Sequence, residues 1–374
     1  MPTPSAPPHS RAPLRIYHAR AGLDGSAAAP ALYARLAQRG FNSVLIPAPW
    51  LLASPTDSRA ALDADTALLD GLQVPIAHWY AQAAAPLSAH RLGLYVDVIL
   101  DRCARDAVPS TAAPGWYQSR HEDPARDPRL SAEARSVLHL HDGPLPPGFL
   151  AAWTERLLRW TANGVDGLVF QAPQRLPAAA WRELGAALRA QRPDVQLLAW
   201  TPGLSPAELA ALRDAGFDAA FSSLPWWDFK SSWLAEEDAR LRAIGSVIAA
   251  PPRSGTARPE TDGLRALWSA AMSGDGIMLD DEAERRLPGV ESALRWLAES
   301  RPHGPLRMLG GRDGGGTALL RDTGQGATAA LAINPSDTRA AALDWDALAP
   351  LLPAADLVPY TPPDGLLAQG HDPP

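Results

Sequence analysis

Residues 164–200, GVDGLVFQAPQRLPAAAWRELGAALRAQRPDVQLLAW, contain two short apolar runs on either side of a longer stretch. The runs at residues 165–170 and 195–200 are almost continuously apolar, which is typical of strands buried on both faces of a parallel sheet. Residues 178–192, between the two runs, are predicted to form a helix. A strand, a helix and a second strand in this order predict the βαβ unit of an α/β fold.

The same alternation of apolar runs and helical stretches extends over most of the chain. Six further strands are predicted at residues 14–18, 43–47, 92–100, 219–222, 246–250 and 276–279. Further helices are predicted at residues 28–38, 147–162, 206–215 and 234–243. Eight β-α units predict a (β/α)8 TIM barrel. The alternative is an open doubly wound sheet, but no G-x-G-x-x-G follows any of the strands to support it.

The segment 203–216, GLSPAELAALRDAG, carries the start and stop signals of a helix. Ser205 is the predicted N-cap, Pro206 lies in the first turn and Gly216 ends the helix.

The pattern changes after Pro302. Residues 306–360 contain the short apolar runs LRML, GTALLRD and ATAALAIN, separated by turns such as GGRDGGG, and no long helix. These features predict a small antiparallel β domain. We therefore expect the barrel over residues 13–302 and the β domain over 303–365, with a disordered Pro-rich tail at 1–12 and a second tail at 366–374.

The composition limits the class of protein. The chain has 374 residues, is 46% hydrophobic and 20% charged, and has a net charge of −7 without a basic patch, so nucleic acid is not an expected partner. Cys103 is the single cysteine, which excludes an intrachain disulfide and a C-x-x-C metal site. There is no apolar run long enough for a membrane span and no apolar segment typical of a secretory signal. We therefore expect a cytoplasmic protein that does not bind membranes.

Three segments resemble one enzyme family. Residues 93–104 (GLYVDVILDRCA), 160–203 and 215–237 (AGFDAAFSSLPWWDFKSSWLAEE) resemble the third, the fourth to fifth and the sixth barrel strands of glycoside hydrolase family 13, the α-amylase superfamily. The nearest likeness is to its α-1,4-glucan maltosyltransferases, which use maltose 1-phosphate. Residues 246–260, at the seventh strand, match least well. The resemblance covers nearly the whole barrel and the β domain, and implies their fold.

The resemblance also locates the positions where catalytic groups should lie. Retaining chemistry needs a nucleophile and an acid–base carboxyl about 5 Å apart, and the family uses a third carboxylate. At the fourth strand, Val169 and Gln171 stand at the Arg and nucleophile positions, and Trp200 stands at the acid–base position of the fifth. Gly255 or Thr256 lies nearest the third. The sequence therefore predicts a catalytically degenerate protein, with activity reduced by several powers of ten.

Other residues of the predicted barrel rim are candidates for substrate binding. Asp97 matches the structural Asp of the third-strand motif and either binds substrate or is a hydrogen-bonded structural carboxylate. Arg102 or Cys103 replaces the His that often follows this strand. Trp200 either stacks on a sugar ring or fills the vacated pocket. Trp50, after the second strand, either stacks on a glucan or packs on its own domain.

The motif WWDF contributes further candidates. Trp226 and Trp227 either face a sugar or a partner, or form a hydrophobic staple with Asp228 near a helix N-terminus. Glu236 and Glu237 are expected on a solvated helix face.

Metal binding and a relocated catalytic set are the remaining possibilities. His139 and His141 in HLHD, with Asp142 beside them, suggest a metal site, but no further ligand is seen to converge on them, so we expect neither a metal nor a cofactor. Asp280, Asp281 and Glu282 follow the eighth strand and Asp101 follows the third, where barrel residues are often functional.

Three hypotheses follow from these observations. The chain is a degenerate maltosyltransferase-like protein that binds α-glucan, maltooligosaccharide or a partner enzyme of glycogen and α-glucan metabolism. Alternatively, it is an active glycosidase or maltosyltransferase with relocated carboxylates. The third hypothesis is a folded protein without a carbohydrate role.

Overall fold

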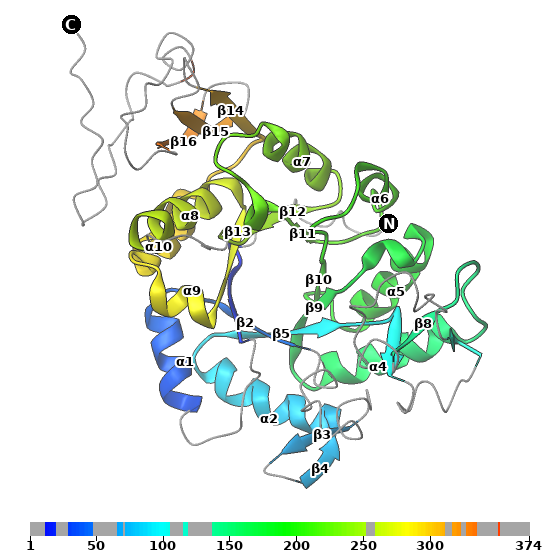
Figure 1. Ribbon diagram of the computed structural model, residues 1–374. Coiled ribbons are helices and arrows are strands. Elements are labelled where there is room, and N and C mark those ends of the chain that lie inside the picture. Colours follow the sequence, from blue (N-terminus) through cyan, green and yellow to red (C-terminus); the bar gives the residue numbers. More distant parts are fainter. Residues whose placement is uncertain are drawn as a thin grey trace, which may run out of the picture. The chain divides into compact units, whose positions relative to one another are not determined.

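A closed barrel of eight parallel strands is the centre of the fold. The computed structural model describes residues 12–19, 29–47, 66–69, 72–104, 115–118, 137–251, 259–310, 316–322, 327–334 and 351. The barrel order is β1-β13-β12-β11-β10-β9-β5-β2. These strands are β1 (Arg15–His18), β2 (Ser43–Ile46), β5 (Gly93–Val98), β9 (Val165–Phe170), β10 (Gln196–Ala199), β11 (Ala219–Phe221), β12 (Ser246–Ala249) and β13 (Gly276–Asp280) (Figure 1). The predicted TIM barrel and all eight of its predicted strands are confirmed.

Helices connect these strands, as predicted, although the helix predicted at residues 206–215 ends at Ala211 and not at Gly216. They are α1 (Ala29–Gln38), α2 (Ile76–Ala89), α4 (Phe149–Ala162), α5 (Ala178–Gln191), α6 (Pro206–Ala211), α7 (Trp233–Arg242), α8 (Pro259–Ser273), α9 (Asp281–Arg286) and α10 (Val290–Ser300), with 3-10 turns η4 (Pro173–Arg175) and η5 (Leu224–Trp226). The predicted cap of α6 is confirmed, since Ser205 Oγ accepts a hydrogen bond from the Glu208 N–H at 3.3 Å. The Glu208 carboxylate accepts the Ser205 N–H in return, at 2.8 Å. No helix in the described ranges has the length and apolar composition needed to cross a bilayer.

Small antiparallel sheets accompany the barrel, and two of them were not predicted. One pairs β3 (Thr66–Leu69) with β4 (Leu72–Pro75), and Figure 1 shows this hairpin beside α2. The other has the order β6-β8-β7 and joins Arg102–Ala104, Val137–Leu140 and Tyr117–Gln118.

The chain divides into two compact units, Ile16–Ala220 and Phe221–Pro374, the latter together with Met1–Arg15. In the first unit the core contains Trp153, Trp160 and Trp181, each exposed by 2% or less. The predicted limits of the barrel and the β domain, at residues 13, 302 and 365, stay predictions.

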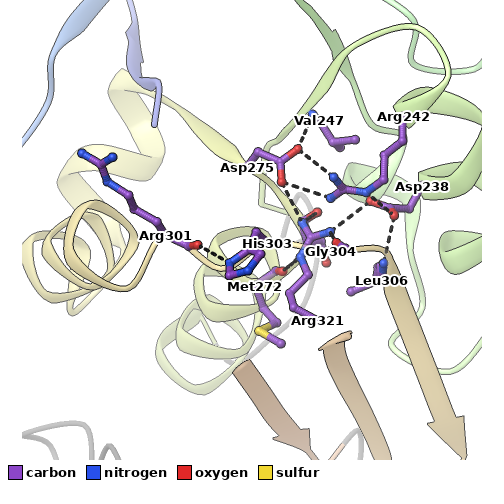
Figure 2. Close-up of polar contacts among 11 residues, drawn as sticks. Asp238, Arg242, Val247, Met272, Asp275, Arg301, His303, Gly304, Leu306 and Arg321 are labelled. Atoms are coloured by element: carbon purple, nitrogen blue, oxygen red, sulfur yellow. Dashed lines mark hydrogen bonds and ion pairs between the residues drawn. The ribbon is translucent and has the colours of Figure 1, made fainter. Parts of the chain in front are cut away.

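The second unit contains the predicted antiparallel sheet of β14 (Leu306–Gly310), β15 (Thr317–Asp322) and β16 (Ala327–Ile333). Its middle strand places Arg321 in the interior, with no exposed surface. The guanidinium donates to the carbonyl oxygens of Met272 at 2.9 Å and Gly304 at 3.0 Å, and to that of Ser273. It also pairs with Asp238 at 3.3 Å (Figure 2).

A second arginine completes this polar network. Arg242 lies between two carboxylates, at 2.8 Å from Asp238 and 3.1 Å from Asp275 (Figure 2). The same carboxylates accept backbone N–H groups, from Leu306 at 3.0 Å and from Val247 at 2.8 Å. A buried charge is tolerated only when its donors or acceptors are satisfied, so these contacts allow Arg321 to stay inside. They tie α7, the end of α8 and the sheet together.

We predict that Arg321→Met destabilises the protein by about 3–5 kcal/mol, because three backbone carbonyls lose their donor inside the fold. Urea unfolding measures this difference. Arg286→Met is the matched control, since the Arg286–Glu282 pair is exposed, with side-chain exposures of 75% and 56%. Its loss should cost less than about 1 kcal/mol. Equal effects of the two variants would contradict a structural role for the buried network.

Candidate functional site

The backbone ladder of β5, β9 and β10 brings the candidate residues to one rim of the barrel. Asp97 pairs with Val169 in the parallel register, and Phe170 pairs with Ala199. The ladder continues beyond the strand ends, because the Gln171 N–H donates to the Val98 carbonyl and the Trp200 N–H donates to the Phe170 carbonyl, both at 2.9 Å. Since parallel strands end on the same side, Gln171 and Trp200 follow these ends at the carboxyl-terminal rim, where barrel proteins place functional groups.

A pocket of about 220 Å³ lies at this rim. Its lining residues are His18, Asp97, Ile99, Arg102, Gln171 and Trp200. The structure thus brings together four residues that the sequence singles out, and Trp200 forms a wall of the pocket. His18 and Ile99 were missed. The signal that could have identified His18 is its position as the last residue of β1.

Asp97 is the buried carboxyl group of this pocket, with 9% of its surface exposed. Gln171 Nε2 donates a hydrogen bond to Asp97 Oδ1 at 2.8 Å. Burial raises the pKa of Asp97 to about 7, although the hydrogen bond from Gln171 acts in the opposite direction. Asp97 is therefore both hydrogen-bonded, as a structural carboxylate would be, and part of the pocket wall. Its carboxyl changes charge near neutral pH.

Arg102 and Asp101 form an ion pair beside Asp97. Arg102 Nη1 donates to both carboxylate oxygens of Asp101, at 3.1 and 3.3 Å. Asp101 is 6% exposed, so its charge is held against the guanidinium rather than presented to solvent. Asp101 is one of the carboxylates considered for a relocated catalytic set, and here it is paired with Arg102.

The WWDF motif lies in the second unit and differs from its predicted role. Trp226 is 64% exposed, whereas Trp227 is 3% exposed and its indole N–H donates to the Ser231 carbonyl at 2.9 Å. Asp228 accepts the N–H groups of Lys230 and Ser231, at 2.9 and 2.7 Å. The predicted place of Asp228 at a helix N-terminus is wrong, because it closes a turn and α7 begins only at Trp233.

Two neighbouring glutamates of α7 have different surroundings. Glu236 is exposed, as predicted, and pairs with Arg240 at 3.2 Å. The prediction for Glu237 is wrong, because this residue is 8% exposed and accepts the Ser223 N–H at 2.9 Å. Burial raises the pKa of Glu237.

The carboxylates after β13 stabilise helix α9. Asp280 is its N-cap and accepts the Ala283 N–H at 2.7 Å. Asp281 pairs with Arg285 at 3.4 Å, and Glu282 pairs with Arg286 at 2.7 Å.

Of the remaining candidate residues, some lie in the part of the chain that the structure describes and others lie outside it. Asp142 of HLHD pairs with Arg175 at 2.9 Å, and His141 is exposed. Among residues with described positions, no three His, Cys, Asp or Glu side chains converge as metal ligands would. Trp50, Gly255 and Thr256 lie outside the described residues.

Comparison with known proteins connects this geometry to a family. No protein-family model matches the sequence. The α-1,4-glucan:maltose-1-phosphate maltosyltransferase of Burkholderia pseudomallei is 36% identical over 272 residues, which cover 68% of this chain. The resemblance to glycoside hydrolase family 13 is confirmed. Within that family, the similar sequence is that of a maltosyltransferase. This agrees with the likeness of residues 93–104, 160–203 and 215–237 described above. The chain spans about a quarter of that relative's length, the matched share being 24%.

Solved structures share the fold at low sequence identity. The α-amylase of Geobacillus thermoleovorans, solved with acarbose, is 12% identical with a TM-score of 0.64, covering 86% of this chain and 87% of that one. The α-amylase of Lactobacillus plantarum is 14% identical with a TM-score of 0.61, covering 82% and 87%. The debranching enzyme of Nostoc punctiforme is 13% identical with a TM-score of 0.59, covering 87% and 91%. These structures show that the chain shares its barrel fold with α-amylases and a debranching enzyme.

The raised pKa of Asp97 predicts a pH-dependent stability. Between the ordinary value of 3.8 and about 7, the unfolded chain loses this proton before the folded chain does. Stability therefore falls as the pH rises through this window, by up to about 4 kcal/mol, and the loss is complete above it. Asp97→Asn keeps the acceptor for Gln171 and carries no charge. We expect the variant to exceed the wild type in stability at pH 8.5, and to equal it near pH 4.

Thermal or urea unfolding at the two pH values measures the difference. Glu183→Gln, which removes an exposed carboxylate of α5, is the control and should show no comparable gain at pH 8.5. An Asp97→Asn effect of the same size at both pH values would contradict the account.

Proposed function

We propose that this chain is a catalytically degenerate maltosyltransferase-like protein that binds α-glucan or a maltooligosaccharide at the rim pocket without transferring it. The observation that carries this proposal is the presence of Gln171 and Trp200 in the pocket wall, directly after β9 and β10. In the family's pattern these two positions hold the nucleophile and the acid–base group.

The chemistry of these side chains supports a loss of turnover. A glutamine amide is too weak a nucleophile to form a glycosyl ester, and an indole cannot exchange protons in a useful pH range. Retaining hydrolysis or transfer needs two carboxyl groups about 5 Å apart. Asp97 is the one carboxyl among the residues that line the pocket in the described part of the chain.

The same pocket keeps features that suit sugar binding. Trp200 supplies an aromatic surface, and Asp97, Arg102 and Gln171 supply polar groups that converge on the same space. An apolar wall with a few directed polar groups is typical of small-molecule sites. The similarity to a maltosyltransferase supports α-glucan as the ligand class.

Isothermal titration with maltoheptaose and glycogen tests the proposal, followed by analysis of the same samples for sugar products and for phosphate released from maltose 1-phosphate. We expect binding heat without products. Trp200→Ala should weaken maltoheptaose binding about tenfold or more, because it removes the aromatic wall, whereas Trp200→Phe should retain most of the affinity.

Sugar or phosphate release would support the second candidate, an active enzyme with relocated carboxylates. Products that disappear in Asp97→Asn or in Asp280→Asn would show which carboxylate is used. Against this candidate, Asp280 already caps α9 and Asp101 already pairs with Arg102.

Docking to an active enzyme of glycogen or α-glucan metabolism is a further candidate function. It is favoured by Trp226, a large apolar side chain that is 64% exposed. If the chain docks through this residue, its addition should change the rate of an active maltosyltransferase, and Trp226→Ala should abolish the change. If the wild-type chain and Trp226→Ala change the rate of the enzyme equally, the chain does not dock through Trp226.

A further inference from the structure

The two oxygens of the Asp97 carboxyl have different surroundings. Oδ1 accepts the amide of Gln171 at 2.8 Å. Oδ2 receives no hydrogen bond from any described residue, although Asp97 lines the pocket and is only 9% exposed. Among the described residues, one neutral donor therefore supports a carboxyl group that is largely removed from water. The second oxygen is available to a ligand that enters the pocket.

The groups around Asp97 do not hold its ionised form firmly. His18 comes from β1, and the Asp101–Arg102 ion pair follows β5. Arg102 directs its guanidinium to both oxygens of Asp101, so its charge is largely compensated. Tyr80 of α2 is fully buried, and burial, with the charge of Asp97 as a second cause, raises its pKa, so its phenol stays neutral. Gln171 and Trp200, which directly follow β9 and β10, have neutral side chains.

We propose that Asp97 recognises the ligand as a carboxylate, its Oδ2 accepting a hydrogen bond from a hydroxyl of a neutral polyhydroxylated ligand, so that binding releases the Asp97 proton to solvent. No covalent bond of the ligand changes. This inference rests on the proposed function, because it concerns the same pocket and the same ligand class.

The direction of the proton transfer follows from hydrogen-bond strength. A hydroxyl donating to a carboxylate forms a charge-assisted bond, about twice as strong as a bond between neutral groups. The ligand therefore binds the ionised form more tightly and shifts the equilibrium toward it. If ligand binding mainly removed water from Asp97, the neutral form would be favoured instead and a proton would be taken up.

A specificity follows from the same contact. A ligand that lacks a hydroxyl at this place leaves Oδ2 desolvated without a donor, and sites of this kind strongly reject such analogues. Asp97 is thus a specificity-determining residue for hydroxyl donors.

Isothermal titration with maltoheptaose at pH 6, 7 and 8, in two buffers of different ionisation enthalpy, measures both affinity and proton release. With a pKa of about 7 in the free protein, the affinity should rise about tenfold between pH 6 and pH 8. Proton release should be largest at pH 6 and fall toward zero at pH 8.

Three variants identify the source of the proton. Asp97→Asn should bind more weakly at pH 8, with no proton release and a flat pH profile. His18→Gln removes the imidazole that also lines the pocket, and binding to this variant should still release the proton. Glu183→Gln should behave as the wild type.

The outcomes separate this inference from the proposed function. Binding without proton release, with proton uptake, or with release that persists in Asp97→Asn would overturn the inference and leave glucan binding intact. No binding heat at any pH would overturn both.

Discussion

The parallel hydrogen-bond ladder of β5, β9 and β10 is the constraint on which the candidate site depends. It fixes the backbones of Gln171 and Trp200, the first residues after β9 and β10. The Gln171 N–H donates to the Val98 carbonyl, and the Trp200 N–H donates to the Phe170 carbonyl. Because this ladder continues to Gln171 and Trp200, the two residues are held at neighbouring positions of the rim. The barrel can therefore keep its geometry when the residues at its rim change, which is what the proposed loss of transfer chemistry requires.

The second unit shows how a charged residue can serve as a core element. Arg321 is enclosed by carbonyls and Asp238, and Arg242 joins Asp238 to Asp275. Such a network contributes when it is complete and becomes costly when one member is removed.

Sequence patterns predicted the barrel well because doubly buried strands have nearly continuous apolar runs, and all eight of them were located. Gln171 and Trp200 were identified through the family resemblance rather than through any local pattern. His18 was missed because its place at the end of a strand does not by itself distinguish a pocket residue from a packed one. Glu237 was placed on the surface because helical charge patterns do not reveal a distant backbone donor such as that of Ser223.

A crystal structure of the protein soaked with maltoheptaose tests the central claim most directly, since it shows both the place of binding and the chemical state of the sugar. The account predicts an intact, non-covalent glucan in the pocket of Trp200 and Gln171, with a sugar hydroxyl at hydrogen-bond distance from Asp97 Oδ2. A cleaved or transferred glucan, a glycosyl bond to any side chain, or a sugar bound only outside this pocket would contradict it.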